Sequence, residues 1–124
     1  MWDKGYQQNF PDLPFKIAAC LLTRIISKPA NDLICLDIGH KAVASEMKTN
    51  PIIFPSIKNY TLIGHNEEHL TLKIENNNLF KVGSTLIGLP WHICPSVALH
   101  QKALIVKEKK IVTAWEISGR NRLY

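Results

Sequence analysis

The chain has 124 residues, of which 46% are hydrophobic and 20% charged, a composition that excludes a disordered chain and fits one globular domain. It contains no apolar run near the ~20 residues of a membrane helix, and residues 1–5 lack a signal peptide's apolar centre, so we expect a cytoplasmic protein with no membrane partner. The net charge of +5 is scattered along the chain, which argues against a nucleic-acid partner.

The three cysteines cannot all pair with one another, and none belongs to a C-x-x-C motif. A disulfide framework is therefore not expected. Cys20 and Cys35 lie in apolar runs, where a free thiol usually behaves as a small buried hydrophobe.

Residues 1–14 are interpreted as an N-terminal lead-in segment, and residues 15–124 as the domain itself. The lead-in is rich in turn-forming residues and carries Pro11 and Pro14, which favour extended or turn backbone. Its aromatic residues are unusual for a free tail, so we expect them to pack on another part of the protein: Trp2, Tyr6 and Phe10.

Within the domain, residues 15–27 are nearly continuously apolar and rich in β-branched side chains. Their length alone permits a helix, but β-branching and the following Lys28-Pro29 favour one long strand, buried on much of both faces. Lys41–Met47 is expected to form one or two helical turns. Further strands are expected at residues 33–37, 60–64, 70–75 and 84–89, an edge strand within 50–57, and a hairpin formed by 103–106 and 111–117.

Seven or eight short strands separated by turns predict an all-β fold, a small barrel or sandwich with at most one or two short helices. The charged run Lys107-Glu108-Lys109-Lys110 lies between the two apolar strands of the hairpin, so we interpret it as a solvated hairpin tip.

The motif most relevant to chemistry is His92-Ile93-Cys94. Residues two apart on an extended backbone point to the same side, so the imidazole and the thiolate could bind one ion. This ligand pair suits zinc far better than magnesium or calcium, and it leaves coordination positions open. The alternative is a buried cysteine beside a packed histidine. Pro90 and Pro95 bracket the motif and favour a rigid, non-helical segment.

Two weaker clusters accompany this motif. Glu68 and His69 stand before a predicted strand, where a carboxylate could orient a metal-bound histidine or bind the metal directly; a solvated turn is the alternative. Asp37 and Lys41 follow a buried strand and are candidates for the substrate side of a site. No Ser-His-Asp order or glycine-rich phosphate loop is present.

Several spaced motifs, taken together and in order, resemble the carboxy-terminal domain of the D-threonine aldolase and D-serine dehydratase family, whose members are similar to alanine racemase. The resemblance covers nearly the whole chain and rests on Phe-Pro-Asp-Leu-Pro-Phe at 10–15, Leu-Thr-Arg-Ile-Ile-Ser-Lys-Pro at 22–29, Leu-Asp-Ile-Gly-His-Lys-Ala at 36–42, Glu-Glu-His at 67–69, Val-Gly at 82–83 and Pro-Trp-His-Ile-Cys-Pro-Ser-Val-Ala-Leu at 90–99.

This resemblance implies an amino-terminal barrel domain that holds pyridoxal phosphate on a lysine, together with a homodimer. The Schiff-base lysine belongs to that barrel, so Lys41 is not assigned the role. His92 and Cys94 match the family's metal ligands, for zinc or alternatively manganese. The implied reaction is retro-aldol cleavage of D-3-hydroxy amino acids, in which the metal binds the substrate's 3-hydroxyl.

Two alternatives stay open. One is β-elimination of the D-serine dehydratase type, because the dehydratases of this family resemble the chain in having cysteine at the second metal-binding position. The other is a non-catalytic β-barrel that binds a partner. On either enzymatic interpretation we expect the isolated chain to be inactive.

Overall fold

The computed structural model describes residues 1–46, 50–75 and 79–123. Within these residues the chain forms eight strands and two short α-helices, with one 3-10 helix near the end. In chain order the elements are α1 (Lys4–Asn9), β1 (Leu21–Ala30), β2 (Leu33–Leu36), β3 (Ile52–Ile53), β4 (Tyr60–His65), β5 (Leu70–Ile74), β6 (Thr85–Pro90), α2 (Ile93–Val97), β7 (Lys102–Lys107), β8 (Lys110–Glu116) and η2 (Ser118–Arg120).

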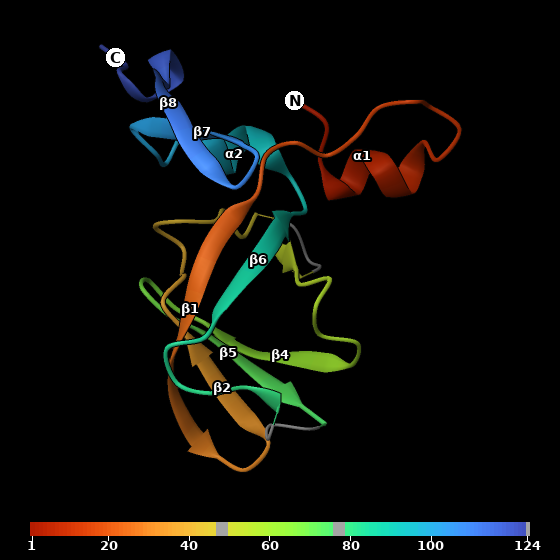
Figure 1. Cartoon of the computed structure of the whole chain (residues 1–124), viewed down its shortest axis with the longest axis vertical. Coiled ribbons are helices and arrows are strands. Elements are labelled where there is room, and N and C mark those ends of the chain that lie inside the picture. Colours follow the sequence, from red (N-terminus) through yellow and green to blue (C-terminus); the bar gives the residue numbers. More distant parts are fainter. Residues whose placement is uncertain (47–49, 76–78, 124) are drawn as a thin grey trace.

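Six strands form one antiparallel sheet in the order β3-β6-β1-β2-β5-β4, and β7 and β8 form a separate hairpin. Figure 1 shows the six-stranded sheet curling as a half barrel, while α1, α2 and the hairpin gather at one end of the molecule together with both termini. The predicted all-β class with two short helices is confirmed. Among the described residues, no helix is both long enough and apolar enough to cross a membrane.

The concave side of the sheet carries the hydrophobic core. Alternate residues of β2 and β5 point into it, as the two-residue period of a strand requires. One residue each from β1, β3 and β6 and several from the segments between strands contribute the rest of the core, with Phe54 as its largest fully buried side chain. The buried cluster consists of Ile25, Ile34, Leu36, Ile38, Val43, Ile52, Phe54, Ile57, Leu70, Leu72, Ile74 and Leu86.

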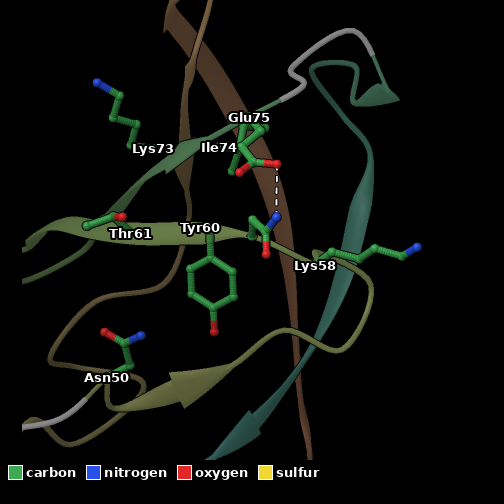
Figure 2. Close-up of a pocket in the computed structure, with 8 residues that line it drawn as sticks. Asn50, Lys58, Tyr60, Thr61, Lys73, Ile74 and Glu75 are labelled. Atoms are coloured by element: carbon green, nitrogen blue, oxygen red, sulfur yellow. Dashed lines mark hydrogen bonds between the residues drawn. The ribbon is translucent and has the colours of Figure 1, made fainter.

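Tyr60 joins the two edges of the sheet. It begins β4 at one edge, and its hydroxyl accepts a hydrogen bond from the N–H of Phe54 (3.3 Å) and donates to the carbonyl of Ile52 (3.5 Å), next to and within β3 at the other edge. Burial raises the pKa of this hydroxyl, and the hydrogen bond from Phe54 partly offsets the rise. In Figure 2 the Tyr60 ring crosses a surface pocket of about 520 Å³ that has Asn50 and Glu75 among its lining residues. None of the predicted site residues lines it.

The long first strand was predicted incorrectly in its position and burial. It begins at Leu21 rather than Phe15, it runs through Pro29, and only Thr23 and Ile25 within it are buried. The proline is tolerated because the pairing with β2 shifts register on both sides of Ser27, which leaves backbone groups outside the regular ladder. Cys20 is exposed, so its predicted burial is wrong, and Cys35 is only partly buried; all three cysteines are free thiols.

The helix expected over Lys41–Met47 is a single turn. The N–H groups of Ala42 and Val43 both donate to the carbonyl of Gly39 (2.9 Å each), and the backbone that follows turns toward α2 rather than continuing a helix. Met47 lies outside the described residues. So does Asn76–Asn78, where the sequence predicts a turn because asparagine tolerates positive φ.

The β7–β8 hairpin is confirmed, and its tip has the left-handed backbone of a two-residue turn, with φ of 50° at Glu108 and 63° at Lys109. Its apolar side chains are largely exposed to solvent. Five large ones have exposed fractions of 57% to 64%: Leu104, Val106, Ile111, Val112 and Trp115.

Gly39 is a position where the fold admits no side chain. A Cβ there would collide with the backbone carbonyl oxygens of Asn66 and Glu67, which accept hydrogen bonds from the N–H groups of His40 (2.9 Å) and Lys41 (3.1 Å). We predict that Gly39→Ala lowers the free energy of unfolding by about 2 kcal/mol, the usual scale for overpacking.

Urea unfolding followed by circular dichroism measures this effect. Gly64→Ala is the matched control, because a Cβ at Gly64 would meet its nearest neighbour only at 3.9 Å. Equal stability of the two variants would contradict the close backbone packing at Gly39.

Candidate functional site

His92 lies at the junction between β6 and α2. Its backbone is extended, with φ −127° and ψ 111°, and the helix begins at the next residue, so Cys94 stands in the first helical turn. The prediction of a non-helical segment is therefore wrong from Ile93 onward. Residues 92 and 94 do not project together from one extended strand, as the sequence led us to expect. Pro95 fits the first turn because the N–H groups there have no partner within the helix.

The backbone on both sides of His92 is held by the lead-in segment. Asp3 is 2% exposed, and its carboxylate accepts one hydrogen bond from the N–H of Tyr6 and another from the N–H of Ile93 (2.9 Å each). The N–H of Gly5 donates to the carbonyl of Trp91 (2.9 Å). One buried carboxylate thus caps α1 and also fixes the first residue of α2.

A second anchor comes from residues 42–46, which run alongside α2 in the opposite direction. Three of these residues, two apart in sequence, meet three positions that are four apart in sequence: one before α2, one within it and one after it. The contacts are Ala42 carbonyl with His100 Nε2 (2.8 Å), Ala44 N–H with Ser96 Oγ (3.1 Å), and Glu46 Oε1 with His92 Nδ1.

Ser96 connects residues 42–46 to the start of α2. It is 1% exposed, and its hydroxyl accepts from the N–H of Ala44 while donating to the carbonyl of His92 (3.1 Å). The backbone of His92 and the segment carrying Glu46 are consequently tied to the same buried hydroxyl.

The donors available for a metal ion at this place are the His92 imidazole and the Cys94 thiol. The His92 side chain is 39% exposed, Cys94 is an exposed free thiol, and Glu46 occupies Nδ1 of the imidazole, which leaves Nε2 for an ion. Across the part of the chain that the structure describes, no cluster of three or more His, Cys, Asp or Glu side chains could hold a metal ion. The residues fit a partial ligand set, in which water or substrate supplies the remaining positions.

The other predicted candidates lie in two places. Lys41 forms exposed ion pairs with Glu67 (3.3 Å) and Glu68 (2.6 Å), and the hydrogen bond to Glu68 is the main reason that the pKa of Lys41 is raised. His69 is exposed beside this group.

Asp37, the first residue after β2, forms hydrogen bonds to β1. Its Oδ1 accepts hydrogen bonds from the Thr23 hydroxyl and from the N–H of Arg24 (2.7 Å each), which ties β1 to the end of β2. The described contacts therefore join Lys41 to Glu68, and they bring neither of these residues to His92.

A pair of histidines with tilted rings lies beside the loop that begins at Gly39. The ring centroids of His40 and His65 are 4.1 Å apart, and both ring nitrogens of His65 are buried without a hydrogen-bond partner. Burial lowers the pKa of His65 and the proximity of His40 lowers it further, while the Gly39 backbone acts weakly in the opposite direction.

Sequence reasoning missed Asp3, Glu46 and Ser96. Asp3 has a local signal, since an aspartate followed by a short polar run is a common helix N-cap. Glu46 has no such signal, because its partner His92 is 46 positions away and only the fold brings the two together.

Protonation of His65 should make the fold sensitive to acid. Its folded-state pKa lies below the ordinary value of 6.5, so below about pH 6.5 the unfolded chain binds more protons and the free energy of unfolding falls. We predict that His65→Phe, which keeps a ring against His40, loses less stability between pH 7.5 and pH 5 than the wild type does, in chemical denaturation at each pH.

His69→Gln, at an exposed position, is the control and should retain the wild-type acid sensitivity. An unchanged pH dependence in His65→Phe would show that the buried imidazole is not responsible.

Comparison with known proteins gives one family and several relatives. Residues 18–106 match the family described as "Putative serine dehydratase domain". A D-threonine aldolase from an Arthrobacter species is 31% identical over 119 residues, which cover 95% of this chain and 31% of the aldolase.

Solved structures show the same architecture. The crystal structure of D-threonine aldolase from Filomicrobium marinum superposes with a TM-score of 0.85 at 18% identity, covering all of this chain and 34% of the aldolase. D-threo-3-hydroxyaspartate dehydratase from a Delftia species superposes with a TM-score of 0.64 at 20% identity over 78% of this chain and 31% of the dehydratase. Two alanine variants of that dehydratase, at a histidine and at a cysteine two positions further on, superpose equally well, and the cysteine variant is in a metal-free form. The chain thus spans about a third of the length of these relatives.

Proposed function

Because the chain belongs to the serine dehydratase domain family, we propose that it is the carboxy-terminal, metal-binding domain of a pyridoxal-phosphate enzyme that cleaves D-3-hydroxy amino acids by a retro-aldol reaction. The observation that carries the proposal is the position of His92 and Cys94 within the matched residues, two positions apart at the start of α2. The 31% identity to a D-threonine aldolase supports the choice of reaction.

Zinc is the proposed metal, with manganese as the alternative, because an imidazole and a thiolate are preferred ligands of zinc. The dehydratase variants support the same two positions, since they replace a histidine and a cysteine that have the same spacing as His92 and Cys94. When bound, the metal would act as a Lewis acid on the substrate's 3-hydroxyl, and pyridoxal phosphate in the barrel would serve as the electron sink.

The role of this chain's own residues is to hold and orient the metal. Nε2 of His92 and Sγ of Cys94 would supply two bonds, while Asp3 and Ser96 fix the backbone that carries them. With only two protein ligands, enough coordination positions remain for the hydroxyl of a small amino acid.

The proposed partners are the barrel domain of the same enzyme and a second subunit. The exposed apolar side chains of the β7–β8 hairpin support a covering partner, because five large ones on a two-stranded sheet are more than a solvated surface usually carries. The lead-in segment, whose helix α1 lies at the same end (Figure 1), adds the exposed aromatic residues Tyr6 and Phe10, and the exposed Phe15 follows it directly. Three free cysteines are typical of a reducing compartment and support a cytoplasmic location.

The cysteine at position 94 favours a second candidate reaction. The D-threo-3-hydroxyaspartate dehydratase has a cysteine, which one variant replaces with alanine, two positions after its histidine, so β-elimination of a D-3-hydroxy amino acid is the alternative to retro-aldol cleavage. In that reaction the substrate's 3-hydroxyl would take up a proton and leave as water, whereas in retro-aldol cleavage it would lose its proton; a metal held by His92 and Cys94 would polarise the hydroxyl in either case. A non-catalytic binding module is the remaining alternative and would need neither a metal nor the barrel.

We predict that a chimera in which this chain replaces the corresponding third of the Arthrobacter D-threonine aldolase converts D-threonine to glycine and acetaldehyde when zinc or manganese is present. His92→Ala should abolish this activity, because the metal loses its imidazole ligand. Acetaldehyde release measures the reaction, and release of pyruvate and ammonia from D-serine measures the competing elimination.

Retained pyridoxal-phosphate absorbance in the His92→Ala chimera controls for folding of the barrel. Full activity of this variant in metal-free buffer would contradict the proposed mechanism, and so would D-threonine cleavage by the isolated 124-residue chain.

A further inference from the structure

We propose that Glu46 is a positioning residue, which holds the His92 ring in the orientation and tautomer that present Nε2 to a metal ion; the inference rests on the metal site proposed above. Glu46 was not among the candidates that the sequence indicated, and it belongs to the loop between β2 and β3 rather than to α2.

The contact itself determines the tautomer. A carboxylate accepts hydrogen bonds and cannot donate them when ionised, so Nδ1 of His92 must carry the proton where it meets Glu46 Oε1. In a neutral imidazole the other nitrogen then has a free lone pair, which is the form that binds a metal through Nε2.

Two further contacts hold Glu46 in place. Residues 42 and 44 are hydrogen-bonded to His100 and Ser96, so Glu46 is the last of three successive contacts rather than an isolated surface pair. Ser96 also restrains the backbone of His92, because its hydroxyl donates a hydrogen bond to the His92 carbonyl. The carboxylate and the imidazole are thus positioned from one buried residue.

Stability alone does not explain the arrangement. The side chains of His92 and Glu46 are 39% and 46% exposed, and ion pairs with that exposure contribute little to folding. The effect on the tautomer does not depend on burial in the same way, because it follows from the direction of one hydrogen bond. Carboxylates that orient a metal-binding histidine typically change metal affinity by about 10-fold to 100-fold.

The first test is the tautomer of His92 in the metal-free 124-residue chain, read from long-range ¹H–¹⁵N correlations of the imidazole at a pH where the ring is neutral. His92→Gln identifies the His92 signals among those of the five histidines. We expect the Nδ1–H tautomer in the wild type and in Glu46→Gln, whose amide oxygen can still accept the hydrogen bond. We expect Glu46→Ala to lose it.

The second test is zinc affinity by competition with a chelator. We expect Glu46→Ala to weaken zinc binding by about 10-fold to 100-fold and Glu46→Gln to weaken it less. Glu67→Gln is the matched control, because it neutralises an exposed carboxylate that pairs with Lys41 near the start of the β2–β3 loop, away from His92. It should leave the zinc affinity within about 2-fold of wild type.

An Nε2–H tautomer in the wild type, or the same tautomer in wild type and Glu46→Ala, would overturn the inference. So would an unchanged zinc affinity in Glu46→Ala, or loss of the Nδ1–H signal when zinc is added to the wild type, since His92 would then bind zinc through Nδ1 and not through Nε2. Absence of zinc binding by the wild-type chain would overturn the metal-positioning role together with the metal site, whereas inactivity of the chimera with zinc bound would refute only the proposed reaction.

Discussion

A single buried carboxylate sets the geometry on which the site depends. Asp3 is 2% exposed and its two oxygens bind the N–H of Tyr6 and the N–H of Ile93, so α1 and α2 are joined at their first turns. A buried carboxylate is unfavourable unless its oxygens are satisfied, and here both accept a backbone hydrogen bond. The position of α2, and with it that of His92, consequently depends on residues near the other end of the chain.

The rest of the site is built on this junction. Strand β6 of the half-barrel sheet leads into the junction between α1 and α2, and the loop after β2 contacts the same junction through the hydrogen bond between Ala44 and Ser96. The same loop is fixed at its start, where Gly39 packs directly against the backbone of residues 66 and 67. The metal site proposed for His92 and Cys94 would need such rigidity, because small displacements of a ligand reduce both metal affinity and reactivity.

The sequence predicted the all-β class and the positions of most strands, because β2, β5 and the hairpin have a clear two-residue period. It misplaced β1, since a continuously apolar run does not show where pairing begins, and the bulge that accommodates Pro29 depends on the partner strand. It also missed α2. Two prolines within six residues, Pro90 and Pro95, indicate a break in regular structure, yet Pro95 fits a first helical turn as readily as a loop.

For the candidate site too, the sequence indicated what depends on local spacing and missed what depends on contacts across the fold. His92 and Cys94 could be named from local spacing, but the helix that carries Cys94 and the carboxylate that meets His92 come from contacts across the fold. Lys41 and Glu68 were named separately, and the structure pairs them with each other. Contacts between residues tens of positions apart leave no periodic pattern in a single sequence, which is why Glu46 and Ser96 were absent from the prediction.

The most direct measurement is X-ray absorption at the zinc edge of the wild-type chain loaded with one equivalent of zinc. The proposed site predicts one sulfur ligand at about 2.3 Å together with imidazole nitrogen at about 2.0 Å and light-atom ligands that water supplies. A shell without sulfur, or a spectrum unchanged by Cys94→Ser, would contradict the assignment of His92 and Cys94 as the metal ligands.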